Sequence, residues 1–377
     1  MSERPNTSRL GHALPFWASL ALVPLAWLGT VWGGWTLLLT PVATWWMFTL
    51  IDGVLGLDTS NADIETPDDQ LFWHRLITLI WAPVQFLTLF GIIGYVARSG
   101  QLNGLELFGV AFGLGILSGT IGIVYAHELM HQQSRLERWL SDILMTMVLY
   151  GHFRSEHLLV HHRYVGTPRD AVTARYNENF HRYFFRVLPE SLTSAWRAEA
   201  GRLDRKGLPV WDKGNPFWRY AAMDLGFLFL ALIVGGWLGL GLFLLQAFIA
   251  IWQLELVNYV EHYGLTRKHL GDGKYEHQKP HHSWNAAHRA SNWLLINLQR
   301  HSDHHYRPDR RFPLLQTYGP DEAPQLPHGY PLMTMMALIP PLWLRRMNPR
   351  VRQWRKTYYP EITDWRPYTT ATNPMPR

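Results

Sequence analysis

Nine histidines stand in short groups whose spacing suits the binding of metal ions. They lie in the stretches "VYAHELMHQQ", "SEHLLVHHRYV", "NYVEHYGL" and "LQRHSDHHYRP". Residues four apart share one face of a helix, so His127 with His131, and His157 with His161, can each bind one ion together. The candidate metal ligands are His127, His131, His157, His161, His162, His262, His301, His304 and His305.

The number of these histidines exceeds what one metal can use. The adjacent rings of His161 and His162, and of His304 and His305, diverge by about 100° on a helix. One ring of each pair can therefore serve one metal, and its neighbour a second. A tetrahedral zinc accepts four ligands at most, whereas nine histidines suit two metals of about five ligands each. A ligand set rich in imidazole and free of thiolate suits iron, copper or zinc.

Acidic residues stand beside these histidines, and they are Glu128, Glu156, Glu261 and Asp303. Each is a candidate to accept a hydrogen bond from a ligand imidazole and so to orient its ring. No catalytic side chain beyond the metal ligands is expected. The alternative is an intramembrane zinc protease, in which His127 and His131 bind one zinc and Glu128 is the general base. The number of other histidines argues against that alternative.

These groups need elements that position them, and the sequence supplies helices of membrane length. The chain has 377 residues, 47% of them hydrophobic, with 19 tryptophans, which favour the membrane interface. A mean hydropathy of only −0.11 requires a large polar part as well. A run of about 20 mainly apolar residues can span a bilayer. The predicted spans are residues 13–32, 36–55, 76–96, 105–126, 220–234 and 240–259.

The histidine groups all fall on one side of the predicted bundle. Six spans place both termini on one face, and the arginine-rich segments fall on that same face, which makes it cytoplasmic. We therefore expect an all-α, polytopic protein of the inner (cytoplasmic) membrane, with its site on the cytoplasmic side. It would form a single domain, residues 1–377, whose helical cap, residues 127–219 and 260–377, carries the histidine boxes. The first apolar run is long enough to span, so no cleavable signal peptide is expected.

Composition limits how such a protein could work. The chain contains no cysteine, which excludes disulfides, iron–sulfur clusters and thiolate metal sites. No nucleotide-binding fingerprint is visible, so no cofactor-binding residues are expected apart from the metal ligands. Electrons for a redox reaction must then come from a separate protein, unless a flavin or haem is bound. The net charge of +6 fits a protein whose partner is membrane lipid and not nucleic acid.

The boxes "HELMH", "HLLVHH" and "HSDHH" resemble those of the integral-membrane fatty acid desaturase/hydroxylase superfamily. Within it, "NYVEHYGL", "YGHFRSEH" and "HSWNAAHRASNWLLINLQRHSDHH" resemble the alkane 1-monooxygenases, also called alkane ω-hydroxylases. The resemblance implies two non-haem iron ions (Fe2+/Fe3+) on the nine histidines. It also implies hydroxylation of the terminal methyl of a medium-chain n-alkane to a 1-alkanol with O2. Electrons would come from rubredoxin and its NAD(P)H-dependent rubredoxin reductase.

Two features bear on how far the resemblance reaches. Gln132 stands where the family usually has Lys or Arg. It follows the last ligand of its box, so the metal site is not in doubt, although a docking contact or a contact near the site could differ. The xylene methyl-hydroxylases share most of these boxes, so an aromatic side-chain methyl is the alternative substrate. The substrate chain length and a homo-oligomeric state stay open from the sequence.

Overall fold

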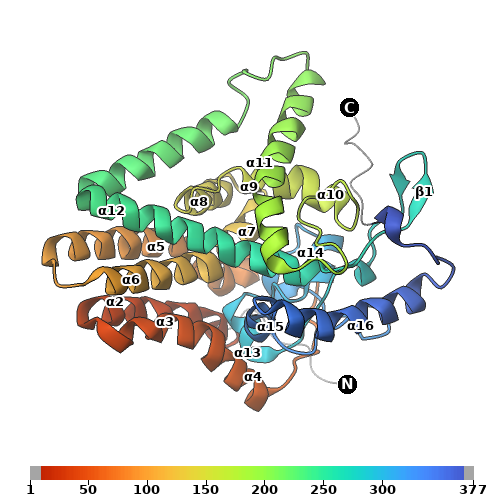
Figure 1. Cartoon of the computed structure of the whole chain (residues 1–377), viewed down its shortest axis with the longest axis horizontal. Helices are drawn as coiled ribbons and strands as arrows, with labels where there is room; N and C mark the ends of the chain where they lie inside the picture. Colours follow the sequence, from red (N-terminus) through yellow and green to blue (C-terminus); the bar gives the residue numbers. More distant parts are fainter. Residues whose placement is uncertain (1–9, 369–377) are drawn as a thin grey trace.

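The computed structural model describes residues 10–368, which form a mainly helical protein. Figure 1 shows long helices lying side by side, with shorter elements gathered at one end of them. The expected all-α, polytopic fold is confirmed. The outermost parts of the predicted domain, residues 1–9 and 369–377, lie outside the described residues.

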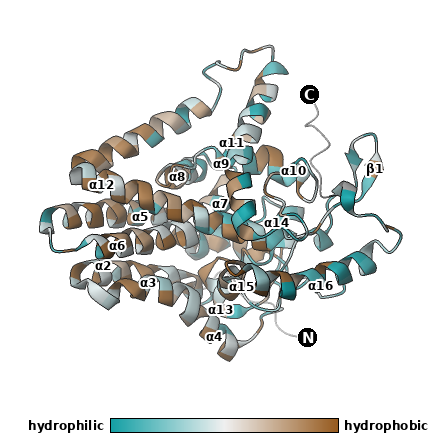
Figure 2. Cartoon of the chain, viewed as in Figure 1, coloured by the Kyte–Doolittle hydropathy of each residue, from teal (hydrophilic) through white to brown (hydrophobic). Residues whose placement is uncertain are grey.

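Five helical stretches among the described residues are long and apolar enough to cross a membrane. Figure 2 shows hydrophobic residues concentrated over these stretches and hydrophilic residues over the opposite end of the molecule. The stretches are Leu10–Trp32, Gly34–Leu55, Asp68–Ser99, Gly104–Met130 and Phe217–His262.

The first four stretches are assembled from α-helices (α) and from short 3-10 or π-helical segments (η). The first contains α1 (Leu10–Ala13), η1 (Leu14–Ala21) and α2 (Leu22–Trp32). The second contains η2 (Gly34–Leu38), α3 (Leu39–Val42), η3 (Ala43–Met47) and α4 (Phe48–Leu55). The third and fourth contain η4 (Asp68–Leu71), α5 (Phe72–Ser99), α6 (Gly104–Leu117), η5 (Ser118–Ile123) and α7 (Val124–Met130). The fifth is α12 (Phe217–His262).

Two glycines turn the chain at the ends of helices in the same backbone conformation. Gly33 has φ 65° and ψ −161°, and Gly236 has φ 59° and ψ −154°, a region open essentially to glycine alone. Gly236 divides α12 into two legs, which run in different directions in Figure 1. The predicted spans 220–234 and 240–259 lie one in each leg. The six predicted spans therefore correspond to five helical stretches, the last of which is bent.

Small residues let α6 and η5 lie close against the second leg of α12. A Cβ added to Gly115 would lie 2.5 Å from the Cβ of Ile249, and one added to Gly119 would lie 2.8 Å from the Cβ of Gln253. Close backbone approach at small residues is a common way to pack helices in membranes. This packing brings the end of α7 next to the end of α12 at His262, where the histidine boxes begin.

The cap contains short helices and one small hairpin. Strands β1 (His269–Gly271) and β2 (Lys274–Tyr275) pair antiparallel, with His269 opposite Tyr275. The helices between the fourth and fifth stretches are α8 (Arg135–Thr146), α9 (Phe153–Glu156), η6 (His157–His161), α10 (His162–Tyr164) and α11 (Phe180–Asp204). Those after α12 are η7 (Pro280–His282), α13 (Arg289–Leu294), α14 (His301–Tyr306), η8 (Phe312–Leu314), α15 (Tyr330–Ala337), α16 (Pro340–Tyr358) and η9 (Arg366–Tyr368).

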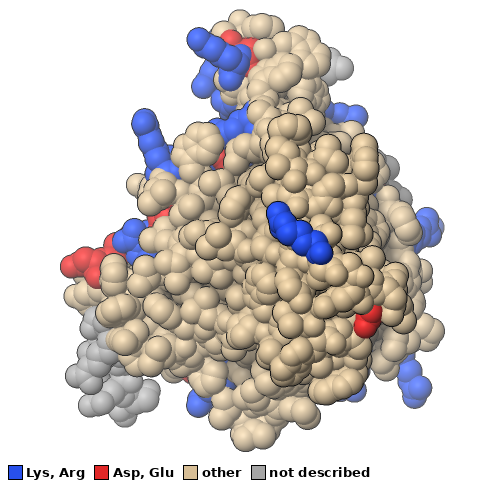
Figure 3. Space-filling view, turned by 90° about the vertical axis from the view of Figure 1, so that its left-hand side faces the viewer, with Lys and Arg blue, Asp and Glu red and all other residues tan. Residues whose placement is uncertain are grey.

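The two ends of the helix bundle differ in charge. Figure 3 looks onto the end away from the cap, where charged side chains are sparse and most of them lie along the rim. The cap end carries α16, which contains Arg345, Arg346 and Arg350. This asymmetry is the pattern on which the predicted orientation depends, because basic residues favour the cytoplasmic side of a membrane.

Gly236→Ala is expected to destabilise the protein by about 1–3 kcal/mol, because alanine would have to adopt a φ near 59°. A Cβ at Gly236 meets no atom within 4 Å, so the loss would report backbone strain alone. Gly241→Ala is the matched control, since its Cβ also enters open space but in regular helix. That control should leave stability unchanged or raise it slightly. Thermal unfolding of the purified variants in detergent compares them, and equal stability would contradict the strained turn.

Candidate metal centre

Four segments bring histidines to one end of the helix bundle. His127 lies in the last turn of α7 and His131 directly after it. The segment formed by η6 and α10 supplies three more histidines, α12 ends at His262, and α14 supplies the last three. All nine histidines that the sequence singled out therefore meet in space, and they form two groups, of five and four.

The first group consists of histidines from three of these segments. Their ring nitrogens lie within 4.8 Å of one another. The Nε2 atoms of His131 and His157 are 3.1 Å apart, those of His157 and His162 are 3.0 Å apart, and those of His162 and His304 are 3.2 Å apart. The members of the group are His127, His131, His157, His162 and His304.

The second group lies beside the first and is almost wholly buried. The Nε2 atom of His301 lies 3.0 Å from Nε2 of His262 and 3.0 Å from Nε2 of His305. The Nε2 atoms of His161 and His305 are 3.2 Å apart. The members of the group are His161, His262, His301 and His305. The rings of His162 and His305 have centroids 4.6 Å apart, so the two groups are in contact.

The division of the adjacent pairs follows the geometry of a helix. His161 and His162 belong to different groups, as do His304 and His305, as the 100° divergence predicts. The expected pairing of His157 with His161 is wrong, because η6 is a π-helix, in which hydrogen bonds join residues five apart. His157 therefore shares its face with His162, and His161 turns to the second group.

The donor set fits metal ions with several ligands at right angles. Imidazole nitrogens about 2.0–2.1 Å from a metal lie about 3 Å apart when the angle between them is near 90°. The measured separations of 3.0–3.2 Å have this length.

Burial, together with the charge of neighbouring histidines, holds the pKa values of His157, His162 and His304 well below the usual value. These rings are therefore neutral, which is the form that binds metal.

Asp170 orients a ring of the second group, and sequence reasoning missed it. Its Oδ2 atom lies 3.0 Å from Nδ1 of His161 and also accepts a 2.6 Å hydrogen bond from the hydroxyl of Thr173. A carboxylate on the second ring nitrogen fixes the tautomer that presents the first nitrogen to a metal. Asp170 lies nine residues beyond His161 in an irregular loop, so no helical spacing connects the two in the sequence.

The four carboxylates that the sequence singled out have different surroundings. Oε1 of Glu261 lies 3.3 Å from Nδ1 of His301. Glu128 accepts hydrogen bonds from Gln132 and from the backbone N–H of Phe312, at 3.2 and 3.4 Å. The structure therefore places Gln132, the departure from the usual family residue, against Glu128.

The remaining two carboxylates contact groups other than histidine rings. Asp303 pairs with Arg310 at 2.5 Å and accepts a 2.9 Å hydrogen bond from the hydroxyl of Tyr318. Glu156 is fully buried, and burial, then the charges of Asp170 and Glu255, raises its pKa well above the usual value. Burial therefore favours the protonated form of Glu156 over the carboxylate.

An apolar cavity reaches both histidine groups from the side of the spans. Leu254 and Val257 of α12 face Ile123 and Val124 of the fourth stretch across it. Gly119 also lines it. The remaining lining residues are Phe153, Asn258, Glu261, Leu298, His127, His157 and His301.

Comparisons with known proteins point to one family. The sequence model of the family described as "Fatty acid desaturase" matches residues 103–337. The chain is 41% identical to alkane 1-monooxygenase 1 of Pseudomonas aeruginosa over 322 residues, which cover 83% of this chain and 82% of that protein. It is 36% identical to alkane 1-monooxygenase 2 of the same organism over 364 residues, covering 94% and 92%. It is 28% identical to the xylene/toluene monooxygenase hydroxylase component XylM of Pseudomonas putida over 326 residues, covering 84% and 83%.

Asp170→Asn is expected to lower metal affinity by about 10- to 100-fold, because the ring of His161 loses its carboxylate acceptor. Metal content after dialysis against a chelator measures the effect, and thermal unfolding checks that the variant is folded. Asp142→Asn is the matched control, since Asp142 is equally buried but pairs with Arg154 and Arg219. Equal metal retention in the two folded variants would show that Asp170 does not position His161.

Proposed function

The chain belongs to the fatty acid desaturase family and, within it, to the alkane 1-monooxygenases. From this premise we propose that it hydroxylates the terminal methyl of medium-chain n-alkanes to 1-alkanols with O2. The observation that carries the proposal is the meeting of nine histidines, seven of them buried, in two adjacent groups that one apolar cavity reaches at His127, His157 and His301. A hydrocarbon substrate and an oxidising metal centre need this combination: an apolar approach and a dense set of metal ligands.

Two non-haem irons are proposed as the cofactor. The first would be held by the group of five histidines and the second by the group of four, with Asp170 fixing His161 and Glu261 beside His301. Irons bound there would supply the redox chemistry that activates dioxygen. Imidazole-rich sites accept iron as well as zinc or copper, and the contact between two such groups suits a two-metal oxygenase better than a single-zinc protease. The protease alternative would use His127, His131 and Glu128 and leave the other histidines without a function.

The apolar cavity, of only about 30 Å³, is proposed to receive the methyl end of the alkane. Each methylene gains about 0.8 kcal/mol on leaving water, so an alkane concentrates in the bilayer around the spans. Leu254 and Val257 of α12, opposite Ile123, would hold its chain by contact alone, since an alkane offers no hydrogen bond. The end of the cavity at His127, His157 and His301 would place the terminal methyl next to both histidine groups and keep bulk water away.

The electron supply and the location complete the proposal. The chain contains no cysteine, and we propose rubredoxin, reduced by an NAD(P)H-dependent reductase, as the electron donor.

Both histidine groups lie at the end of the bundle where the basic helix α16 is attached. This supports a multi-pass protein of the inner membrane that forms one domain and opens its site to the cytoplasm, through the cap formed by residues 127–219 and 260–377.

The purified protein, supplied with iron, O2, rubredoxin and reductase, is expected to convert n-alkanes to 1-alkanols. Incubation with a series of n-alkanes and with alkylbenzenes, followed by identification of the products, measures both the reaction and the preference. Benzylic alcohols as the main product would favour the alternative substrate class suggested by the similarity to XylM. Peptide cleavage without oxygen consumption would overturn the proposal.

Leu254→Ala is expected to shift the preferred alkane to a longer chain, because removal of the isobutyl group extends the cavity. Each additional buried methylene should raise the relative specificity for the longer substrate about fourfold. Leu244→Ala is the matched control, because Leu244 lies on the same helix but is 45% exposed on its outer face. Ratios of kcat/KM across a chain-length series compare the variants. An identical profile in both variants would show that Leu254 does not bound the substrate.

A further inference from the structure

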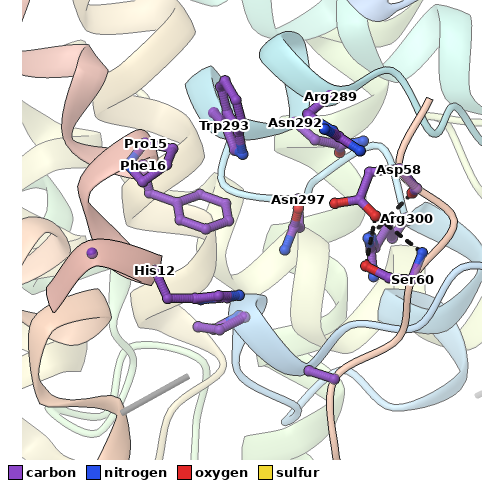
Figure 4. Close-up of a pocket in the computed structure, with 13 residues that line it drawn as sticks. His12, Pro15, Phe16, Asp58, Ser60, Arg289, Asn292, Trp293, Asn297 and Arg300 are labelled. Carbon is purple, nitrogen blue, oxygen red and sulfur yellow. Dashed lines mark hydrogen bonds between the residues drawn. The ribbon is translucent and has the colours of Figure 1, made fainter. Parts of the chain in front are cut away.

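A second cavity, of about 420 Å³, lies outside the histidine groups and has a different chemistry. It is lined by the start of the first stretch, including Pro15 and Phe16, and by the loop after the second stretch, including Asp58. The cap supplies Arg289 of α13 and Arg300. Figure 4 shows the apolar side chains of Pro15 and Phe16 on one side, and Asp58, Arg289 and Arg300 on the other.

Both arginines retain unused hydrogen-bonding capacity. Arg300 is only 6% exposed; it donates a 2.7 Å hydrogen bond to the carbonyl of Leu315 and 3.5 Å hydrogen bonds to Oδ1 of Asn61 and the carbonyl of Asp58, while its Nε has no partner. The Nε of Arg289 and the Oδ1 of Asn292 are also buried without a partner. Within residues 10–368, neither arginine forms an ion pair of 4.0 Å or less, and Asp58 and Asp303 act on Arg300 only from beyond that distance, whereas most buried charges are paired. The nearby Asp58 accepts hydrogen bonds from the backbone N–H and hydroxyl of Ser60.

The charge of the cavity indicates an anionic ligand. Two guanidinium groups face one carboxylate, which leaves an excess of positive charge in a partly dry site. A guanidinium presents several N–H groups in a fixed plane and matches the oxygens of a phosphate. A buried, incompletely paired Arg300 that lines the cavity is the feature that such an anion would satisfy.

The position of the cavity indicates that this anion belongs to a lipid. The first stretch begins and the second ends at its walls, so it lies at the depth where two spans leave the membrane. Leu10 and Leu14 beside it are 40% and 52% exposed, and Trp293 lines it, as aromatic rings do at headgroup level. We propose that this cavity binds the phosphate headgroup of an anionic phospholipid, whose acyl chains run along the outside of the first stretch.

The bound headgroup would contact the back of the loop that carries a metal ligand. Asn297 and Arg300 line the polar cavity, while Leu298 of the same loop and His301, which follows the loop at the start of α14, line the apolar one. Ile296 and Asn297 have φ values of 42° and 60°, a backbone conformation that costs free energy and persists only when its surroundings hold it. A headgroup on Arg300 would therefore stabilise residues 294–300 in place.

Delipidated full-length protein in detergent, titrated with phosphatidylglycerol, tests the proposal without relying on hydroxylation. At about 100 times its dissociation constant, the lipid should raise the unfolding temperature by about 3 °C and slow amide exchange in residues 292–300. Mass spectrometry of the protein before delipidation should show phosphatidylglycerol retained on it. Arg289→Gln should lose these effects and Arg289→Lys should keep part of them. Arg345→Gln, which removes an exposed charge from α16, should behave like the wild type.

Three outcomes would overturn the proposal. Equal effects of inorganic phosphate at the same concentration would assign the cavity to free phosphate and not to a lipid. Undiminished effects of phosphatidylglycerol on Arg289→Gln would place the lipid elsewhere on the protein. Protection of residues 292–300 by reduced rubredoxin alone, with none from lipid, would make the cavity a contact site for the electron donor. If Arg289→Gln does not fold, the comparison of Arg289→Lys with Arg345→Gln and the lipid retained by the wild type decide the matter.

Discussion

The structure depends on holding nine imidazole rings together, seven of them buried. The ring centroids of His127 and His304 are 4.3 Å apart, although the two residues are 177 positions apart in the chain. Buried polar rings are costly unless their nitrogens have partners, and several Nδ1 atoms here, among them those of His162 and His305, have none in the protein. Metal ions would supply partners for the converging Nε2 atoms of the same rings. The bundle must therefore bring four chain segments to one place. Its close packing at Gly115 and Gly119 brings together two of them, the end of the fourth stretch and the end of α12.

The same requirement explains why the site lies where it does along the spans. The fourth stretch packs closely along α12. His131 directly follows the fourth stretch and His262 ends α12, so these metal ligands are held in place by the packed membrane helices. The apolar cavity runs between these two helices and meets the ligands at their ends. A hydrocarbon can thus remain in an apolar environment until its end reaches the histidines, where the polar cap begins. The proposed reaction and the membrane location follow from one arrangement.

Much of this arrangement could be predicted from the sequence, because it depends on residue patterns within short segments of the chain. Apolar runs indicated the spans, and the breaks between the predicted spans 13–32 and 36–55 and between 220–234 and 240–259 contain the turns at Gly33 and Gly236. The nine histidines were recognisable from their spacing. Features set by tertiary packing were not: the π-helical turn η6 reverses the expected pairing of His157. The contact of Asp170 with His161 depends on a loop whose path no periodicity describes. One partner of Glu128, the backbone N–H of Phe312, comes from η8, far along the chain.

The most direct test of the account is the amount and identity of metal in the intact, purified protein. Elemental analysis after expression in iron-replete medium should give about two iron ions per chain, one for each histidine group. A single zinc ion per chain, with no iron and no second metal, would contradict the assignment of two metal sites and the oxygenase chemistry built on them.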